Sequence, residues 1–137
     1  MKITKKIVNE LSYEIVGCAI EVHKAMGPGL LESVYQSCMQ EELTDHGLEF
    51  KSQVLLPVFY KGKDVGGKLK LDLLVEDLVI VELKAVDIML PLFQAQLLSY
   101  LRMAEKPKGL LINFHAENIV NQMIPLVTER FALLPDK

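Results

Sequence analysis

The sequence contains no tryptophan, only two cysteines and 7% aromatic residues. With so few aromatics, recognition of single-stranded nucleic acid by base stacking has little support. Cys18 and Cys38 form neither a C-x-x-C pair nor a disulfide framework, so we expect a reducing, cytoplasmic location. No run of residues approaches the ~18 apolar positions of a membrane-spanning helix, and polar residues soon follow the basic N-terminus. We therefore expect neither a membrane span nor a secretory signal.

Hydrophobic residues make up half of the 137 positions, and charged residues make up 24%. This composition excludes a disordered chain, because such chains lack the apolar surface that offsets conformational entropy. The length is that of one domain, and we expect a single domain over residues 1–137. The net charge of -3 gives no general attraction to nucleic acid or to anionic lipid.

The hydrophobic period changes along the chain and predicts an α/β fold. A central mixed four-stranded sheet is expected, built as an α-β-β-β-α-β core flanked by helices, with an extra N-terminal helix. Pro57 suggests that the first strand lies at an edge or bulges. The predicted elements are helices at 7–26, about 30–46, about 91–105 and about 117–130, with Pro125 interrupting the last, and strands at 50–60, 68–75, 78–85 and 109–114.

Two carboxylates interrupt the most apolar pair of predicted strands. Strand alternation places Glu82 and Lys84 on one face, and a turn at residues 76–77 brings Asp72 beside residues 81–82. One interpretation is structural, with Glu82 paired to Lys84 or Asp72 paired to Lys70. The other is a hard metal site, since two neighbouring acids repel each other unless a cation intervenes. Oxygen ligands without nearby histidine or thiolate favour magnesium or manganese over zinc.

Two predicted helices carry further polar pairs. Glu32 and Tyr35 lie three residues apart near the start of the second helix. Glu32 alone could be a first-turn acid favoured by the helix dipole. Gln96 and Tyr100 lie four residues apart on one helical face, and alone they could be a surface hydrogen-bond pair.

The ordered set Glu32, Asp72, Glu82-x-Lys84 and Gln96-x-x-x-Tyr100 resembles the PD-(D/E)XK nuclease superfamily, particularly its RecB-like exonuclease branch. More closely, residues 27–114 resemble the small bacterial GxxExxY family, whose name-giving pattern is seen here at Gly29, Glu32 and Tyr35. The resemblance implies a restriction-endonuclease-like sandwich and a metal-dependent nuclease, a hydrolase of phosphodiester bonds.

The resemblance also implies roles for the residues. Asp72, Glu82 and the Leu83 carbonyl would hold Mg2+ or Mn2+, with Glu32 completing the ligand set. Lys84 would stabilise negative charge at the phosphate. Gln96 would orient Lys84 or the water, and Tyr100 would contact the phosphate backbone.

The evidence in the sequence for a nucleic-acid partner is a group of lysines on the predicted hairpin. Five lysines fall within residues 51–70 with a single acid, Asp64, which gives either a phosphate-contacting ridge or an ordinary solvated hairpin. Tyr35, Lys68 and Lys70 are candidate nucleic-acid contacts, and DNA is favoured over RNA. The apolar run Ile88-Met89-Leu90 leads us to expect a homodimer.

Two rival functions stay open from the sequence. One is a non-catalytic nucleic-acid-binding or regulatory domain on the same fold. The other is an unrelated α/β interaction protein in which the acids are structural. The three histidines, including His46, are isolated in sequence without metal-ligand spacing, which favours structural or surface roles.

Overall fold

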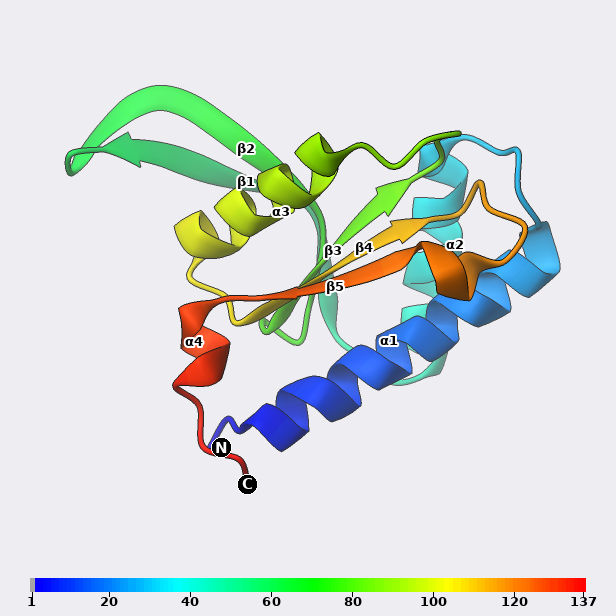
Figure 1. Cartoon of the computed structure of the whole chain (residues 1–137), viewed down its shortest axis with the longest axis horizontal. Coiled ribbons are helices and arrows are strands. Elements are labelled where there is room, and N and C mark those ends of the chain that lie inside the picture. Colours follow the sequence, from blue (N-terminus) through cyan, green and yellow to red (C-terminus); the bar gives the residue numbers. More distant parts are fainter. Residues whose placement is uncertain (1) are drawn as a thin grey trace.

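The computed structural model describes residues 2–137 (Figure 1). The chain order of its elements is α1 (Lys5–Met26), α2 (Glu32–Asp45), β1 (Phe50–Tyr60), β2 (Lys63–Val75), β3 (Val79–Lys84), α3 (Pro91–Ala104), β4 (Lys108–Asn113), a 3-10 helix η1 (Ile119–Gln122), β5 (Met123–Val127) and α4 (Glu129–Ala132). None of the described helices combines the length and the apolar character that a membrane crossing requires.

The five strands form one mixed sheet in the order β1-β2-β3-β4-β5. Strands β3 and β4 are parallel, and the other neighbours are antiparallel. Helix α3 is the crossover that parallel neighbours need, because it returns the chain to the starting end of the sheet. The predicted α/β fold with a mixed sheet flanked by helices is confirmed.

The sheet has five strands where four were predicted, and the helix expected at 117–130 was wrong. Met123–Val127 forms edge strand β5, and Pro125 lies opposite Leu110 of β4. Proline lacks an N–H, so it disrupts a helix interior but is tolerated on an edge strand. Only the short segments η1 and α4 remain helical in this region.

Strands β1 and β2 form a hairpin whose tip extends beyond the rest of the sheet (Figure 1). Strand β2 begins at Lys63 and not at 68, because Lys63 and Asp64 already pair with Tyr60 and Phe59 of β1. Gly66 and Gly67 lie within β2 at the register shift and do not form a loop. The expectation for Pro57 is confirmed in both parts. Strand β1 lies at the edge, and its register shifts between Pro57 and Phe59.

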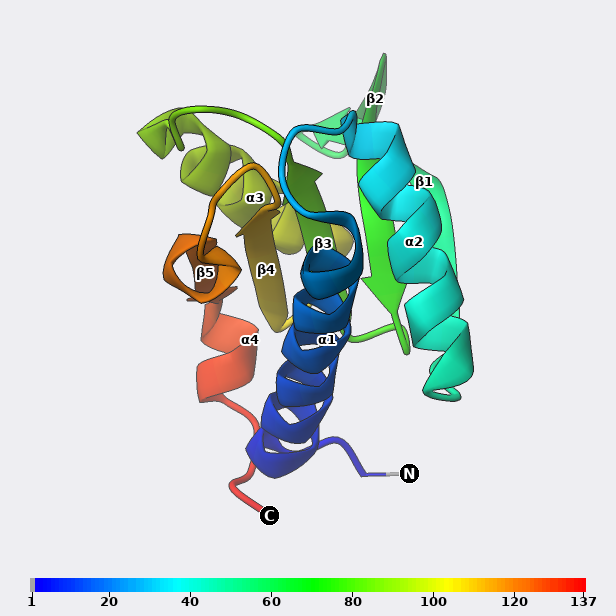
Figure 2. The same cartoon turned by 90° about the vertical axis from the view of Figure 1, so that its right-hand side faces the viewer.

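Helices cover both faces of the sheet (Figure 2). Buried residues of α1 and α2 pack on one face, against Leu73, Val81 and Ile112 among others. Helix α3 packs on the other face through Leu97 and Leu101, against residues such as Ile80 and Leu111. The central strands are therefore apolar on both faces, as expected for strands buried between layers.

Candidate metal centre

Asp72 and Glu82 meet where strands β2 and β3 stop pairing. The ladder runs from Val75 opposite Val79 to Leu73 opposite Val81. Beyond it, the Asp72 N–H donates to Glu82 Oε1 at 3.1 Å, and the Leu83 N–H donates to Asp72 Oδ2 at 2.9 Å. Each carboxylate thus takes a main-chain donor that would otherwise continue the ladder. The register predicted from the turn does bring the two acids together.

A distortion in β1 lies opposite this point. Gln53 has φ 50°, in the left-handed region, and the pairing passes from Ser52–Leu73 to Val54–Leu71 without a Gln53–Asp72 pair. Simple alternation would place Leu71 on the same face as Leu73. Leu71 instead packs in the α3 core, whereas Leu73 packs in the α1/α2 core. The side-chain alternation of β2 is therefore interrupted at Asp72. Because of this local irregularity, the Asp72 carboxylate does not occupy a regular strand position opposite β1.

Glu82 is the most buried of the three candidate acids Glu32, Asp72 and Glu82, with 8% of its surface exposed. Burial disfavours its charged form, and the negative charge of Asp72 adds to that effect, so that the pKa of Glu82 is raised to about 8. The positive charge of Lys84 works in the opposite direction. Without a further cation, the Asp72–Glu82 pair therefore retains a proton near neutral pH.

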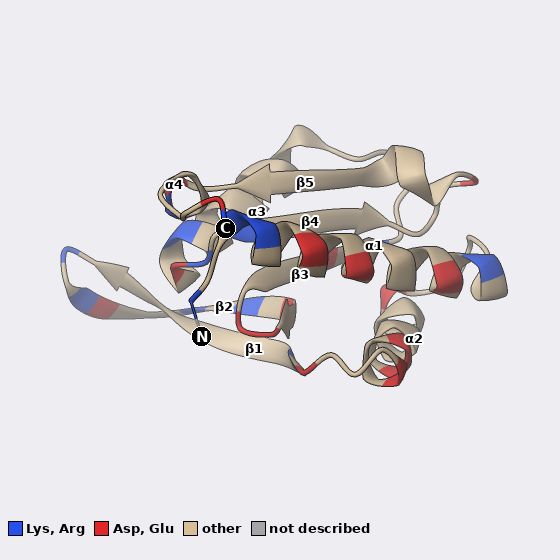
Figure 3. Ribbon diagram, turned by 90° about the horizontal axis from the view of Figure 1, so that it is seen from below, with Lys and Arg blue, Asp and Glu red and all other residues tan. Residues whose placement is uncertain are grey.

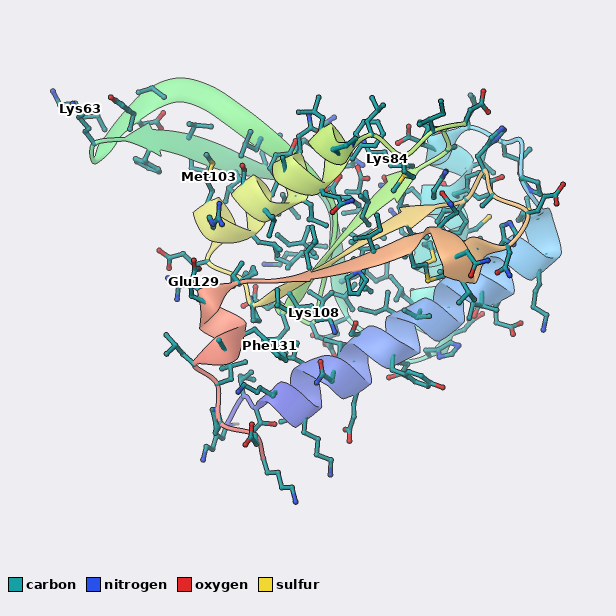
Figure 4. The ribbon with its side chains drawn as sticks, viewed as in Figure 1. Lys63, Lys84, Met103, Lys108, Glu129 and Phe131 are labelled. Atoms are coloured by element: carbon teal, nitrogen blue, oxygen red, sulfur yellow. The ribbon has the colours of Figure 1, made fainter. Side chains whose placement is uncertain are left out.

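Lys84 ends strand β3 close to the start of α3 (Figure 4). Its Nζ lies 4.4 Å from the centroid of the Phe93 ring, within cation–π range. Among residues 2–137, no ion pair within 4 Å joins Lys84 to Glu82 or Lys70 to Asp72. The two ion pairs of the structural interpretation are thus not formed.

The negative charge of Asp72 acts on two residues from different helices, Glu32 of α2 and Tyr100 of α3. Loss of water raises the pKa of Glu32, while Lys84 lowers it and Asp72 raises it. The pKa of Tyr100 is raised first by burial and then by the charges of Glu82 and Asp72. Helices α2 and α3 therefore each place one residue within electrostatic range of the carboxylate pair.

In the described part of the chain, the side chains of the other predicted residues form no hydrogen bond or ion pair with Asp72 or Glu82. Gln96 is exposed one turn before Tyr100, and no side-chain hydrogen bond of it is found in the described part of the chain. Lys68 and Lys70 are exposed on the β2 segment that leads into Asp72. Leu83 is buried in the α1/α2 core, so only its main chain could serve the site.

Tyr35 has a structural role, and its side chain is not on the surface where the predicted contact with nucleic acid would be made. Its side chain is fully buried and stacks on Phe114 with ring centroids 4.7 Å apart. The hydroxyl donates to the Gly27 carbonyl at 2.5 Å and accepts from the Leu30 N–H at 3.2 Å. Tyr35 therefore fixes the loop before α2, and through that loop it sets the position of Glu32.

Asn113 is a supporting residue that the sequence reasoning missed. It is 2% exposed at the end of β4, and its amide binds both the N–H and the carbonyl of Val86, at 3.1 and 2.9 Å. Its oxygen also accepts from the His115 N–H at 3.1 Å. These bonds hold the segment that follows Lys84. The available signal was a single amide at the end of an otherwise apolar strand.

The chemistry of the donor set fits a hard divalent cation. Carboxylate and carbonyl oxygens are the ligands that magnesium and manganese prefer. Leu83 presents its N–H to Asp72, and in a strand the N–H and C=O of one residue point to the same side. The Leu83 carbonyl is therefore directed toward the side of the Asp72 carboxylate, where the β2–β3 ladder has ended.

Fold and site together define an α/β protein with paired carboxylates and a lysine at the end of its central strands. A model described as the PD-(D/E)XK nuclease superfamily matches residues 9–125. The chain therefore belongs to the PD-(D/E)XK nuclease superfamily. No curated protein and no solved structure is similar enough to count as a match.

Proposed function

We propose that this protein is a metal-dependent nuclease that hydrolyses phosphodiester bonds of DNA. The observation that carries the proposal is the pairing of buried Glu82 with half-buried Asp72, in the electrostatic environment of Lys84. In the described structure neither acid has a basic partner within 4 Å. A charge arrangement of this kind is costly for folding alone, and it is typical of sites that gain a cation. Membership of the superfamily supports the same reaction class.

In this proposal Asp72, Glu82 and the Leu83 carbonyl hold Mg2+ or Mn2+, and Glu32 extends the ligand set from α2. The ion supplies Lewis acidity and lowers the pKa of a bound water. The protein supplies the fixed oxygen donors, because Asp72 and Glu82 are each held by a main-chain N–H. The position of Glu32 depends on the loop that Tyr35 fastens.

Lys84 is proposed to stabilise negative charge that develops on the scissile phosphate. The Phe93 ring orients the ammonium group of Lys84. A carboxylate partner would neutralise the charge of that group, whereas the aromatic ring does not. Tyr100 would contact the phosphate backbone near the acids, and Gln96, one turn earlier on α3, would orient Lys84 or the water. From the same residues we also propose that the chain belongs to the GxxExxY family and to the RecB-like branch of the superfamily.

The β1–β2 hairpin is the part of the molecule best suited to a phosphate backbone. Lysines gather along it, whereas acidic residues mark α1 and α2 (Figure 3). Lys63 lies at the hairpin tip (Figure 4), and Lys68 and Lys70 follow it toward Asp72. This row of positive charge would guide DNA to the site in a protein whose net charge is negative.

The decisive experiment compares Lys84→Ala with the wild type in plasmid cleavage with Mg2+ or Mn2+. We expect a loss of about 100-fold in rate with the metal-dependent rise in melting temperature retained. Asp72→Asn should lose both the cleavage and the metal-dependent rise. Lys24→Ala, which changes an exposed lysine at the end of α1, is the control and should change neither.

Two results would reject the nuclease proposal. The first is a Lys84→Ala protein that cleaves like the wild type but melts much lower, because Lys84 would then be a structural partner of the acids. The second is a wild-type protein that binds DNA and cleaves it with neither ion. That result would leave the non-catalytic binding domain as the function.

We also propose that the protein forms a homodimer through the segment between β3 and α3 together with the first turn of α3. Ile88 is 71% exposed and Leu92 is 59% exposed, on either side of Leu90. Adjacent exposed apolar side chains commonly mark interfaces. Sedimentation at tens of micromolar should detect a dimer in the wild type and a monomer in Ile88→Lys, and a wild-type monomer would contradict the proposal.

A cytoplasmic location stays a prediction from cysteine usage, with Cys18 and Cys38 both free.

A further inference from the structure

Helices α1 and α2 face each other with two pairs of metal-ligating residues. Glu14 and Cys18 lie one turn apart on α1, and Glu42 and His46 lie one turn apart at the end of α2. Ligand atoms of Cys18, Glu42 and His46 all lie within 4.8 Å of one another. The His46 Nε2 is 3.3 Å from Glu42 Oε2, and the His46 Nδ1 is 3.6 Å from Glu14 Oε1.

We propose that Cys18, Glu42 and His46 bind a zinc ion, with Glu14 orienting the histidine. Thiolate, imidazole and carboxylate are a ligand combination that zinc accepts, whereas magnesium prefers oxygen alone. Three protein ligands leave the fourth tetrahedral position to a water. A histidine that ligates metal through one nitrogen usually donates the other N–H to a carboxylate, and Glu14 stands at that nitrogen.

Burial separates the roles within this cluster. Cys18 is fully buried at the helix interface, whereas Glu42 and His46 are partly exposed at its edge. The ion would therefore meet Glu42 and His46 at the exposed edge of the cluster, with the Cys18 thiol on its buried side. Zinc would displace the thiol proton to solvent, leaving a zinc–thiolate bond and linking α1 to the last turn of α2.

The electrostatics of the cluster favour a cation. Burial and the charges of Glu42 and Glu14 raise the pKa of Cys18 to about 11, so the thiol is neutral in the metal-free protein. A dication would neutralise the two carboxylates and stabilise the thiolate. Contact of the His46 ring with the two acids alone is the competing arrangement, and it would leave Cys18 without a ligand role.

This site is distinct from the proposed nuclease centre. Glu32 begins α2 and His46 follows its last residue, so the length of a 14-residue helix, about 20 Å, separates them. The donor chemistry differs as well, with a thiol and an imidazole at one end and oxygens alone at the other. The zinc proposal therefore does not rest on the nuclease proposal.

The test uses the 137-residue chain with Asp72→Asn, so that a metal at the nuclease centre does not contribute. After treatment with a chelator, the protein is titrated with Co2+ as a spectroscopic probe and then with Zn2+. We expect one Co2+ per chain with a sulfur-to-cobalt charge-transfer band in the near ultraviolet, and displacement of the Co2+ by Zn2+. Cys18→Ser should lose the band, and His46→Gln should weaken zinc binding by about 100-fold or more. Glu14→Gln should weaken it by about 10-fold.

Matched controls change the same residue types elsewhere. Cys38→Ser removes the other free cysteine, and His115→Gln removes a histidine paired with Asp87. Both should bind zinc as the parent protein does. Because His46 is exposed, His46→Gln should fold normally, which circular dichroism would verify. A parent protein without the charge-transfer band, or equal affinity after Cys18→Ser or His46→Gln, would overturn the zinc site. The His46 ring would then be only a structural bridge between Glu14 and Glu42.

Discussion

The buried carboxyl group of Glu82 makes the stability of the metal-free protein depend on pH. The folded-state pKa is about 8, compared with an ordinary value of 4.5. Between these values the folded state holds a proton that the unfolded state has lost. The free energy of unfolding should therefore fall as pH rises through this window, by about 1.4 kcal/mol per unit where the difference is complete.

The change that tests this reasoning is Glu82→Gln, which keeps the shape and removes the titration. Between pH 5 and pH 8 the wild type should lose roughly 3–4 kcal/mol relative to the variant. Because Glu82 is only 8% exposed, solvent screening reduces this value little. Urea unfolding at unit steps of pH, in a chelating buffer, measures the difference directly.

A matched control and a metal arm complete the experiment. Glu41→Gln changes an exposed glutamate of α2 and should follow the wild-type pH profile. Millimolar Mg2+ at pH 8 should restore stability to the wild type and not to Glu82→Gln, because the ion would stabilise the ionised carboxylates of Asp72 and Glu82. A Glu82→Gln protein whose stability falls with pH as steeply as that of the wild type would refute burial as the cause.

Two further predictions concern residues that position the site. Tyr35→Phe removes a hydroxyl that forms hydrogen bonds with both Gly27 and Leu30. The substitution should lower the free energy of unfolding in urea by about 1–3 kcal/mol. An unchanged urea midpoint would mean that water replaces the hydroxyl. Gly109→Ala would place a Cβ 3.1 Å from leucine methyl groups of α3, and it should cost about 1–3 kcal/mol. Gly17→Ala is the matched control, because its Cβ meets nothing within 4 Å in the interior of α1, and it should stabilise by about 0.5–1 kcal/mol. Equal thermal shifts for the two glycine variants would contradict the close approach of α3.

Much of the architecture follows from local chemistry along the chain. Helix α1 was predicted because apolar residues recur every three or four positions, and it ends before Gly27 as predicted. The bounds of β1 were predicted to the residue. Asp72 and Glu82 could be singled out because charged residues are costly in strands that are otherwise apolar. Such signals need only the residue and its close neighbours in sequence.

Other features depend on residues that are distant in sequence, so only the tertiary structure decides them. Residues 123–127 become a strand because the free edge of β4 offers hydrogen bonds, and Pro125 prevents a helix there. Gln53 of β1 has a left-handed backbone conformation, and Asp72 on the neighbouring strand β2 therefore has no regular pairing partner. The cluster of Cys18, Glu42 and His46 has no sequence signature, because the two helices meet only when their apolar faces pack on the sheet. Local periodicity selects the elements, whereas the burial of their apolar faces determines which side chains meet.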